Sequence, residues 1–502
     1  TRQLERMGRL KSDDVLDKTL NAMLATYDPH SNYYPPIDAM ELNRQTTLQL
    51  EGIGVSIRPE RGNEDYTKIE TIVEGGPASK SGQVKSGDRI IGVAQDGEKM
   101  IDVIGWPSSE IVGLIRGKRG TKITVRLLAT GASMSQARNV SLVRDVIQEE
   151  DAGVRSRTVE LTRDGTKHVF GVLEIPSFYF DYRSRRAGAE YRSVSEDTAK
   201  ALESLKAQKV EGILIDLRND PGGSLEEVAR MLGQVIKSGP VVQIRDGNGN
   251  VSVYEDTDGG EQLYAGPMAV LINLASASAS EIYSAAIQDY ERGIIIGSTT
   301  TGKGTAQVQL DTLAHGQATL TQRKFYRVTG GSTQNKGVIP DIKLVDIYNE
   351  EFGERKSKNA LKWDTIPTAP FKRAGSTQPY VAKLSQASAQ RTLADSQFKY
   401  LEARTAINKK SADQKKVVLD IDQRRAELMD LEKQTLAVEN QRRVATGQVP
   451  YANWESYQAS IDALVESRAK MKAHLRPALP EEETFVTEAA NVLLDYAKLQ
   501  GR

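Results

Sequence analysis

The chain has 502 residues, and 67 Lys and Arg residues balance 67 Asp and Glu residues, so no global charge draws it to nucleic acid or anionic lipid. It has no cysteine, which excludes thiol catalysis, disulfide bonds and cysteine-ligated zinc and fits an oxidising compartment. The four histidines lie far apart in the sequence, which argues against a zinc site. The sequence contains no run of about 18 apolar residues, the length needed to span a membrane. The chain length predicts about three or four domains.

Residues 1–48 are predicted to be helical because apolar residues recur at helical spacing until the run DPHSNYYPP, whose paired prolines stop a helix. The chain begins with Thr rather than Met, so we expect a processed form or an excised part of a longer protein, from which any signal peptide is missing. Residues 49–145 are predicted to be a compact β module. Its strand-like runs are separated by glycines, with one short helical segment, SSEIVGLIRG, among them.

Residues 146–348 alternate apolar strands with helical stretches, which predicts a largely parallel, buried sheet. The strand-like runs are VFGVLEI, GILIDLR, MAVLINLA and GIIIGS. Residues 349–502 are polar and charged and are predicted to form a helical domain, mostly helical from about residue 378. Its basic doublets are compatible with nucleic-acid binding, but interleaved acidic residues favour a solvated helical face.

The run LINLASASASEI, residues 271–282, is a buried strand that ends in small residues and leads into a helix. Serine is a common helix cap, but three serines alternating with alanine exceed what a cap needs. Parallel sheets carry functional sites at the carboxyl ends of their strands, and a helix N-terminus offers free N–H groups to a developing oxyanion. A serine nucleophile is therefore a candidate here.

The stretch GSTTTGKGT, residues 297–305, has two interpretations. The phosphate-loop pattern is complete through Lys303, but Gly304 follows where that loop needs a Ser or Thr for magnesium. Lys303 also follows the next strand, which returns it to the sheet edge of the serines, and a lysine can activate a serine. Such a lysine must be neutral, and residues 299–305 contain no carboxylate that would keep it charged. Gln307 could orient the amine.

The run ILIDLRNDPGGSL, residues 213–225, combines a strand, a turn with paired glycines and a helix. Glycines permit the close backbone approach from which an oxyanion hole is often built, although an ordinary strand-to-helix turn is the alternative.

Together SASASEI, GKGTAQ, DLRNDPGG and KGVIPD resemble the carboxy-terminal processing proteases, in particular the tail-specific proteases of the bacterial periplasm. The resemblance implies a crotonase- or ClpP-like parallel-sheet core in a multidomain α/β and α+β protein. It also implies that Ser278 is the nucleophile, Lys303 the general base and Gln307 the residue that orients it. Asp289 is expected to support the site structurally. The implied oxyanion-hole residues are Gly222 or Gly223 and Ala279. Thr301 departs from the aromatic residue that often precedes GKG in this family.

The segment LEGIGVSI, residues 50–57, resembles the carboxylate-binding loop of a PDZ domain, and KSGDRIIGV, residues 85–93, resembles its other hallmark. Backbone N–H groups of residues 52–54 can point at a terminal carboxylate while the next strand pairs with the peptide. A glycine-rich strand start without function is the alternative. The implied tail-binding residues are Leu50, Gly52, Ile53, Gly54 and Val55. The helix with Ile111, Val112 and Leu114 is expected to wall an apolar pocket.

The sequence therefore predicts a periplasmic serine endopeptidase that recognises apolar C-terminal tails through its PDZ domain, which could also gate the site. The expected partners are protein substrates, including membrane-associated ones, and an adaptor protein. No metal, nucleotide, nucleic acid or other cofactor is expected. The alternatives are a PDZ scaffold with an inactive core, against which the presence of Ser, Lys and Gln argues, and a crotonase-type acyl-CoA enzyme, which would not need a PDZ module.

Overall fold

The structure is a computed structural model, and it describes residues 12–501 except 37, 40–41, 43–48, 61–62, 149–152, 187, 189–190, 256–261, 311–312, 314, 349–351, 470 and 472–478. The chain divides into two compact units. Unit 1 comprises residues 1–39, 153–461 and 477–502, and unit 2 comprises residues 40–152 and 462–476. None of the helices in the described ranges is long and apolar enough to cross a membrane.

Unit 1 is built on a six-stranded sheet in the order β10-β11-β12-β15-β16-β19. Only the β10–β11 pair is antiparallel, and the other four pairs are parallel. The strands are β10 (Arg155–Arg163), β11 (Thr166–Glu174), β12 (Ile213–Asp216), β15 (Met268–Ile272), β16 (Ile294–Gly297) and β19 (Ile342–Lys343). Every residue of β12, β15 and β16 is buried, as parallel strands covered on both faces should be. The predicted parallel sheet is confirmed.

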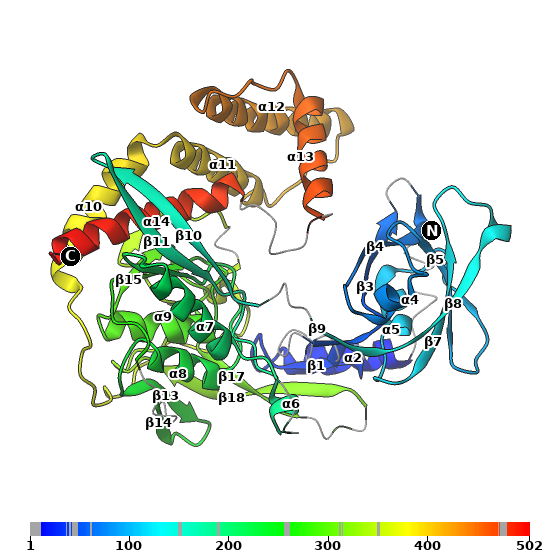
Figure 1. Cartoon of the computed structure of the whole chain (residues 1–502), viewed down its shortest axis with the longest axis horizontal. Helices are drawn as coiled ribbons and strands as arrows, with labels where there is room; N and C mark the ends of the chain where they lie inside the picture. Colours follow the sequence, from blue (N-terminus) through cyan, green and yellow to red (C-terminus); the bar gives the residue numbers. More distant parts are fainter. Residues whose placement is uncertain are drawn as a thin grey trace. The chain divides into compact units, whose positions relative to one another are not determined.

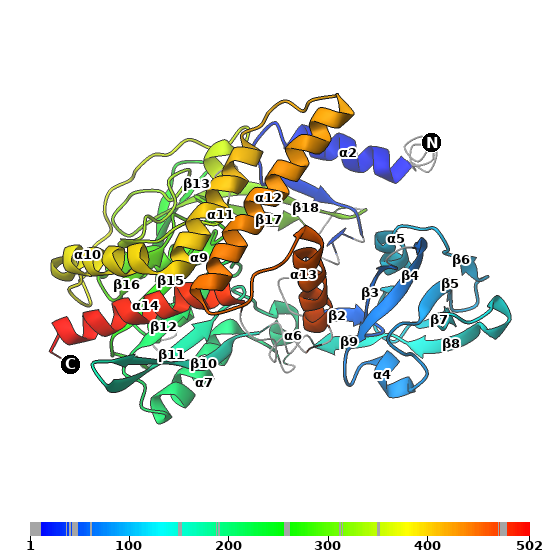
Figure 2. The ribbon, with the colours of Figure 1, turned by 90° about the horizontal axis from the view of Figure 1, so that it is seen from above.

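Helices pack against this sheet, and Figures 1 and 2 show α14 running along it. The helices of this part of unit 1 are α6 (Tyr182–Arg186), α7 (Val194–Ala207), α8 (Leu225–Gly233), α9 (Ala279–Asp289), α10 (Gln378–Ala394), α11 (Ser396–Ala412) and α14 (Pro480–Leu499). Side chains of α10, α11 and α14 share one hydrophobic cluster with Leu214 and Leu271 of the central strands. Because side chains alternate along a strand, Ile213 and Ile215 point to the other face.

A second, antiparallel sheet of unit 1 has the order β1-β18-β13-β14, with β17 pairing to β18. Its strands are β1 (Asn32–Tyr34), β13 (Pro240–Asp246), β14 (Val251–Glu255), β17 (Thr305–Leu310) and β18 (Gln317–Tyr326). Strand β17 starts two residues after Lys303, so this sheet fixes the exit of the lysine loop. Strand β1 brings the DPHSNYY segment to the same sheet.

Unit 2 is the predicted β module. Its main sheet has the order β3-β4-β5-β7-β8 with β6 pairing to β5, β2 pairs with β9, and all pairs are antiparallel. The strands are β2 (Gln49–Gly52), β3 (Val55–Glu60), β4 (Asn63–Ile72), β5 (Arg89–Gln95), β6 (Ile101–Asp102), β7 (Lys122–Leu128), β8 (Arg138–Val143) and β9 (Asp145–Gln148). Its helices are α4 (Pro77–Ser81) and α5 (Ser108–Ile115), and α5 confirms the predicted helical segment.

The two ends of the chain agree with the sequence to different degrees. In the N-terminal region α2 (Ser12–Leu24) is helical, whereas residues 1–11 lie outside the described residues. In the charged region α10, α11, α12 (Ile421–Ala445), α13 (Trp454–Ala469) and α14 confirm the predicted helices. The domain boundaries at residues 48, 145 and 348 stay predictions, and α14 belongs to unit 1 together with the parallel sheet.

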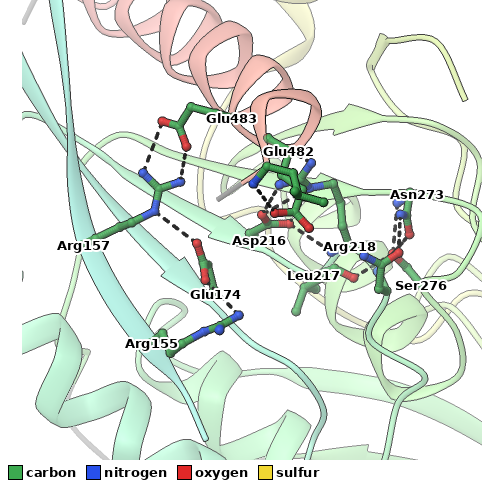
Figure 3. A network of polar contacts seen from close by, with 12 residues as sticks. Arg155, Arg157, Glu174, Asp216, Leu217, Arg218, Asn273, Ser276, Glu482 and Glu483 are labelled. Carbon is green, nitrogen blue, oxygen red and sulfur yellow. Dashed lines mark hydrogen bonds and ion pairs between the residues drawn. The ribbon is translucent and has the colours of Figure 1, made fainter. Parts of the chain in front are cut away.

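Ion pairs and a backbone contact fasten the first turn of α14 to the sheet (Figure 3). Arg157 of β10 reaches Glu483 at 2.8 Å and also pairs with Glu174 of β11 at 3.1 Å. Arg218, which follows β12, donates to the Glu482 carbonyl at 3.2 Å while pairing with Asp216. The C-terminal helix is therefore held by polar contacts at its start and by apolar burial along its length.

We predict that Leu493→Ala lowers the free energy of unfolding of unit 1 by about 2–5 kcal/mol, because this fully buried side chain of α14 packs against Gly212 and Phe170. Urea unfolding followed by tryptophan fluorescence measures the loss. Leu499→Ala, at an exposed position of the same helix, is the control and should change the free energy by less than about 1 kcal/mol. Equal effects of the two substitutions would contradict the integral role of α14.

Candidate active site

Ser278 lies between β15 and α9, as the N-cap of that helix, with φ 55° and ψ −110°. A positive φ is costly for a residue with a side chain and persists only where the surroundings impose it, which is common at functional sites. The neighbouring serines have structural bonds: Ser276 donates to the Leu217 carbonyl at 2.8 Å and Ser280 to the Asp220 carbonyl at 2.9 Å. Both are fully buried, whereas Ser278 is partly exposed. The geometry singles out the middle serine.

The carboxylate of Glu281 joins the serine to the lysine loop. It accepts the N–H of Ser278 at 2.9 Å and the N–H of Lys303 at 2.9 Å on the same oxygen. Its other oxygen accepts the Gly302 N–H at 2.7 Å and the Thr300 hydroxyl at 2.6 Å. Two segments that are separate in sequence are thus fixed by one side chain.

Glu281 is a residue that the sequence reasoning missed. It is fully buried, and burial raises its pKa to about 7 against the hydrogen bonds from Thr300, Ser278, Gly302 and Lys303, which lower the pKa. The sequence held a signal, since Ser278 followed three residues later by a glutamate is a helix capping box. Its reach to the lysine loop could not be inferred from that pattern.

The Lys303 side chain lies in a mixed electrostatic environment. Burial lowers its pKa, while the charges of Glu354, Glu281 and Asp28 act in the opposite direction. Residues 299–305 contain no carboxylate, as the sequence analysis noted. The fold nevertheless brings the carboxylates of Glu354, Glu281 and Asp28 near Lys303 from other segments of the chain. The net direction is still downward, as a lysine acting as a base requires.

Gln307 has partners other than the lysine. Its amide donates to the hydroxyls of Thr305 at 3.1 Å and Thr321 at 2.9 Å, and within the described ranges Lys303 Nζ has no hydrogen bond. An orienting role of Gln307 toward Lys303 therefore stays a prediction. Thr301, which departs from the usual aromatic residue, donates to the Leu274 carbonyl at 2.6 Å and so ties the lysine loop to the serine loop.

The glycine turn lies directly against the serine. A Cβ on Gly222 (φ 102°) would stand 2.8 Å from Ser278 Cβ and 2.9 Å from the Ala279 nitrogen. The Gly222 N–H donates to Asp220 at 2.8 Å, so it is engaged. Ala279 begins α9, where an N–H has no partner within the helix. Of the two predicted glycines, Gly223 is the better donor candidate beside Ala279.

The side chain of Asp220 binds the backbone of this glycine turn. It is fully buried, one oxygen accepts the Gly222 N–H, and the other has no hydrogen-bond partner in the described structure. Burial raises the pKa of this carboxyl well above its usual range. Beyond the DPGG pattern, nothing in the sequence indicated this buried carboxyl group.

Asp289 is not brought to the serine and lysine. It lies at the last residue of α9, the end opposite Ser278, and binds Arg327 through Nε at 3.1 Å. Thr329 donates to the same carboxylate at 3.3 Å. Asp289 thus fastens the far end of α9 to the segment after β18, a placement compatible with the predicted supporting role.

The predicted tail-binding residues lie together in unit 2. Leu50 and Gly52 belong to β2, which pairs with β9, and Val55 begins β3. Gly54 has φ 77°, and a Cβ there would stand 3.3 Å from Ile147. The carbonyls of Ile53 and Gly54 accept bonds from the segment 73–78, so the loop is held from its carbonyl side.

The role of α5 as the wall of a tail pocket stays a prediction. Its Ile111 is completely buried in the hydrophobic core of unit 2. Val112 and Leu114 are only partly buried. As for metals, no group of three or more suitable ligands occurs among the residues that the structure describes.

Family models match three consecutive parts of the chain. Residues 41–129 match the PDZ domain, residues 169–344 match peptidase family S41, and residues 347–498 match the C-terminal domain of tail specific protease. Ser278, Lys303, Gln307 and the glycine turn all fall within the peptidase match.

Two proteins of similar sequence are a tail-specific protease and a carboxy-terminal processing protease. The tail-specific protease of Haemophilus influenzae is 38% identical over 437 residues, which is 84% of this chain and 60% of that protein. The carboxy-terminal processing protease CtpA of Bacillus subtilis is 29% identical over 342 residues, covering 66% of this chain and 65% of that protein. The chain thus spans less than two thirds of the length of these two relatives.

Solved structures include the photosystem II D1 C-terminal processing protease, with 26% identity, 68% of this chain and 86% of that chain covered, and a TM-score of 0.37. The PDZ domain of a carboxy-terminal protease from Vibrio cholerae in complex with peptide is 43% identical, covers 20% of this chain and 99% of that chain, and has a TM-score of 0.19.

The predicted fold class, a parallel-sheet core with a PDZ domain and flanking helical regions, is confirmed by the strand order and the family matches. The chain therefore contains a peptidase family S41 domain at residues 169–344, together with a PDZ domain and the C-terminal domain of tail-specific proteases.

Proposed function

We propose that the protein is a serine endopeptidase in which Ser278 is the nucleophile and Lys303 its general base. The observation that carries the proposal is the shared Glu281 oxygen, which accepts the N–H groups of both residues at 2.9 Å. Burial that lowers the pKa of Lys303 supports the role of base, and the glycine turn beside Ser278 supports an oxyanion hole.

The chemistry follows from these positions. Neutral Lys303 takes the proton of the Ser278 hydroxyl as its oxygen attacks the carbonyl carbon of the substrate, and the carbonyl oxygen becomes an oxyanion. The N–H groups of Gly223 and Ala279 would stabilise that oxyanion. On collapse the peptide nitrogen leaves with the proton from Lys303. Water then hydrolyses the acyl-serine by the same route and restores the free serine.

The PDZ domain supplies the second half of the proposal. Its loop at residues 52–54 would bind the C-terminal carboxylate of a protein substrate while the tail pairs with β3. Apolar last residues are the preferred tails, by the resemblance to the family. A periplasmic location, membrane-associated substrates and an adaptor protein stay predictions. An inactive scaffold would bind the same tails without cleaving them.

Ser278→Ala should abolish cleavage of a protein with an apolar tail while leaving tail binding unchanged, because a single oxygen is removed. Cleavage is followed by gel electrophoresis and tail binding by fluorescence anisotropy. Ser276→Ala is the matched control: it loses the bond to the Leu217 carbonyl, costs about 1 kcal/mol of stability and keeps appreciable activity. An active Ser278→Ala variant would refute the peptidase proposal.

Lys303→Arg should be as inactive as Lys303→Ala, since arginine stays protonated in proteins and cannot act as a base. The measurement is kcat/KM on a tailed protein substrate, with thermal unfolding to show that each variant folds. Substantial activity of the arginine variant would mean that residue 303 serves as a fixed cation.

Amidating the C-terminus of a tail peptide should weaken its binding at least about tenfold, because charged hydrogen bonds contribute about 1.5–3 kcal/mol. A tail ending in two aspartates should bind as weakly as the amide. Isothermal calorimetry on the Ser278→Ala chain measures binding without cleavage. Equal affinity for free and amidated tails would refute the PDZ role and leave the serine–lysine chemistry untouched.

A further inference from the structure

A buried carboxylate outside the peptidase match contacts the lysine loop. Glu354 begins a short 3₁₀ helix (Glu354–Lys356) and is 2% exposed. Its backbone N–H donates to the Thr301 carbonyl at 2.9 Å. It lies within residues 347–498, the match to the C-terminal domain of tail specific protease. A residue of that domain thus bonds directly to the loop of the proposed base.

The Glu354 carboxylate reaches the same loop a second time through a glutamine. Oε1 accepts the side-chain amide of Gln334 at 2.8 Å, and the carbonyl oxygen of that amide accepts the Gly304 N–H at 2.8 Å. Gln334 is fully buried, so water does not compete for these bonds. Residues 301 and 304, on either side of Lys303, are therefore both fixed by Glu354.

The remaining oxygen of Glu354 lies 2.7 Å from His30 Nε2. His30 belongs to the DPHSNYY run before β1, ahead of all three family matches. The same run contacts the other side of the site, because Asp28 accepts the Thr321 hydroxyl at 2.8 Å and Thr321 in turn accepts the amide of Gln307. The N-terminal segment and Glu354 thus contribute to partly buried polar contacts around the start of β17.

The charge of Glu354 matters as well as its bonds. Among the charges that act on Lys303, Glu354 is the largest that opposes the lowering of its pKa by burial, ahead of Glu281 and Asp28. His30 and Gln334 contact different oxygens of this carboxylate. Removing this negative charge should therefore make the Lys303 amine easier to deprotonate. A substitution that changes the size of the side chain but keeps its charge should not.

We propose that Glu354 is a positioning residue for Lys303: it holds the lysine loop at residues 301 and 304 and keeps a negative charge, paired with His30, beside that loop. This inference rests on the proposed function in taking Lys303 as the base. It assigns part of the active site to segments outside the peptidase match.

The test measures the Lys303 amine directly. The full-length chain, in the Ser278→Ala background and in the same background with Glu354→Gln, is labelled with trace acetic anhydride across a pH series, and Lys303 acetylation is read by mass spectrometry. Glutamine keeps the size and the bond from Gln334 but removes the charge. Below the labelling midpoint Lys303 should react at least about twofold faster in Glu354→Gln, with the midpoint at lower pH.

Two further variants make the result specific. Glu488→Gln removes another buried carboxylate, which lies on α14 and pairs with Arg391 of α10, and should leave the Lys303 labelling curve unchanged. Glu354→Asp keeps the charge and should keep the midpoint of the parent chain. It also serves if Glu354→Gln fails to fold, because a Glu354→Asp midpoint clearly below that of the parent chain, although the charge is kept, would overturn the inference.

Activity gives an independent readout. In chains with Ser278 intact, the acid limb of the kcat/KM profile should move to lower pH in Glu354→Gln, because the base must lose its proton to act. A purely structural role would lower kcat/KM at every pH without moving the limb, and that result, or an unchanged labelling curve, overturns the inference. If the parent chain cleaves no substrate, the proposed function fails, while labelling still decides the part of Glu354.

Discussion

The arrangement of the site depends on one buried carboxylate. Glu281 is anchored in the first turn of α9, and its two oxygens hold the backbone of the serine and of the lysine loop. Charged acceptors form stronger hydrogen bonds than neutral ones, and a water-excluded position strengthens them further. A single side chain thereby converts two separate strand ends, those of β15 and β16, into one rigid constellation. Ser278, whose φ is positive, donates its N–H to this carboxylate.

The buried carboxyl group of Glu281 makes the stability of the fold depend on pH. The pKa of Glu281 is raised to about 7 in the fold, against an ordinary value of 4.5, so the folded chain holds a proton that the unfolded chain releases. Stability from this group is therefore greatest below about pH 4.5 and falls as the pH rises through about 7. Asp220, whose pKa burial also raises, acts in the same direction beneath the glycine turn. Burial thus raises the pKa of two carboxyl groups that contact the proposed oxyanion hole and the lysine loop.

Local patterns in the sequence predicted the parts whose cause is local. Continuous apolar strands predicted the parallel sheet, and small residues after a buried strand predicted a serine at the carboxyl end of β15, where Ser278 lies. What the sequence could not supply were side chains that come from afar: Glu354 and Asp28 near Lys303, and the threonines that occupy Gln307. These contacts join residues separated by many elements, and no periodicity encodes them. The burial of Ile111 escaped for a related reason, since periodicity shows a helix but not which of its apolar residues the sheet covers completely.

The position of α14 has a consequence for how the chain reaches its fold. Residues 480–499 complete the hydrophobic cluster over β10, β12, β15 and β16. The first of these strands, β10, begins more than 300 residues before α14. The part of this sheet face that α14 covers therefore stays open until residues 480–499 have been synthesised. Contacts of such long sequence separation close slowly, and an uncovered apolar sheet is prone to association. Completion of the unit 1 core is thus delayed until α14 is available.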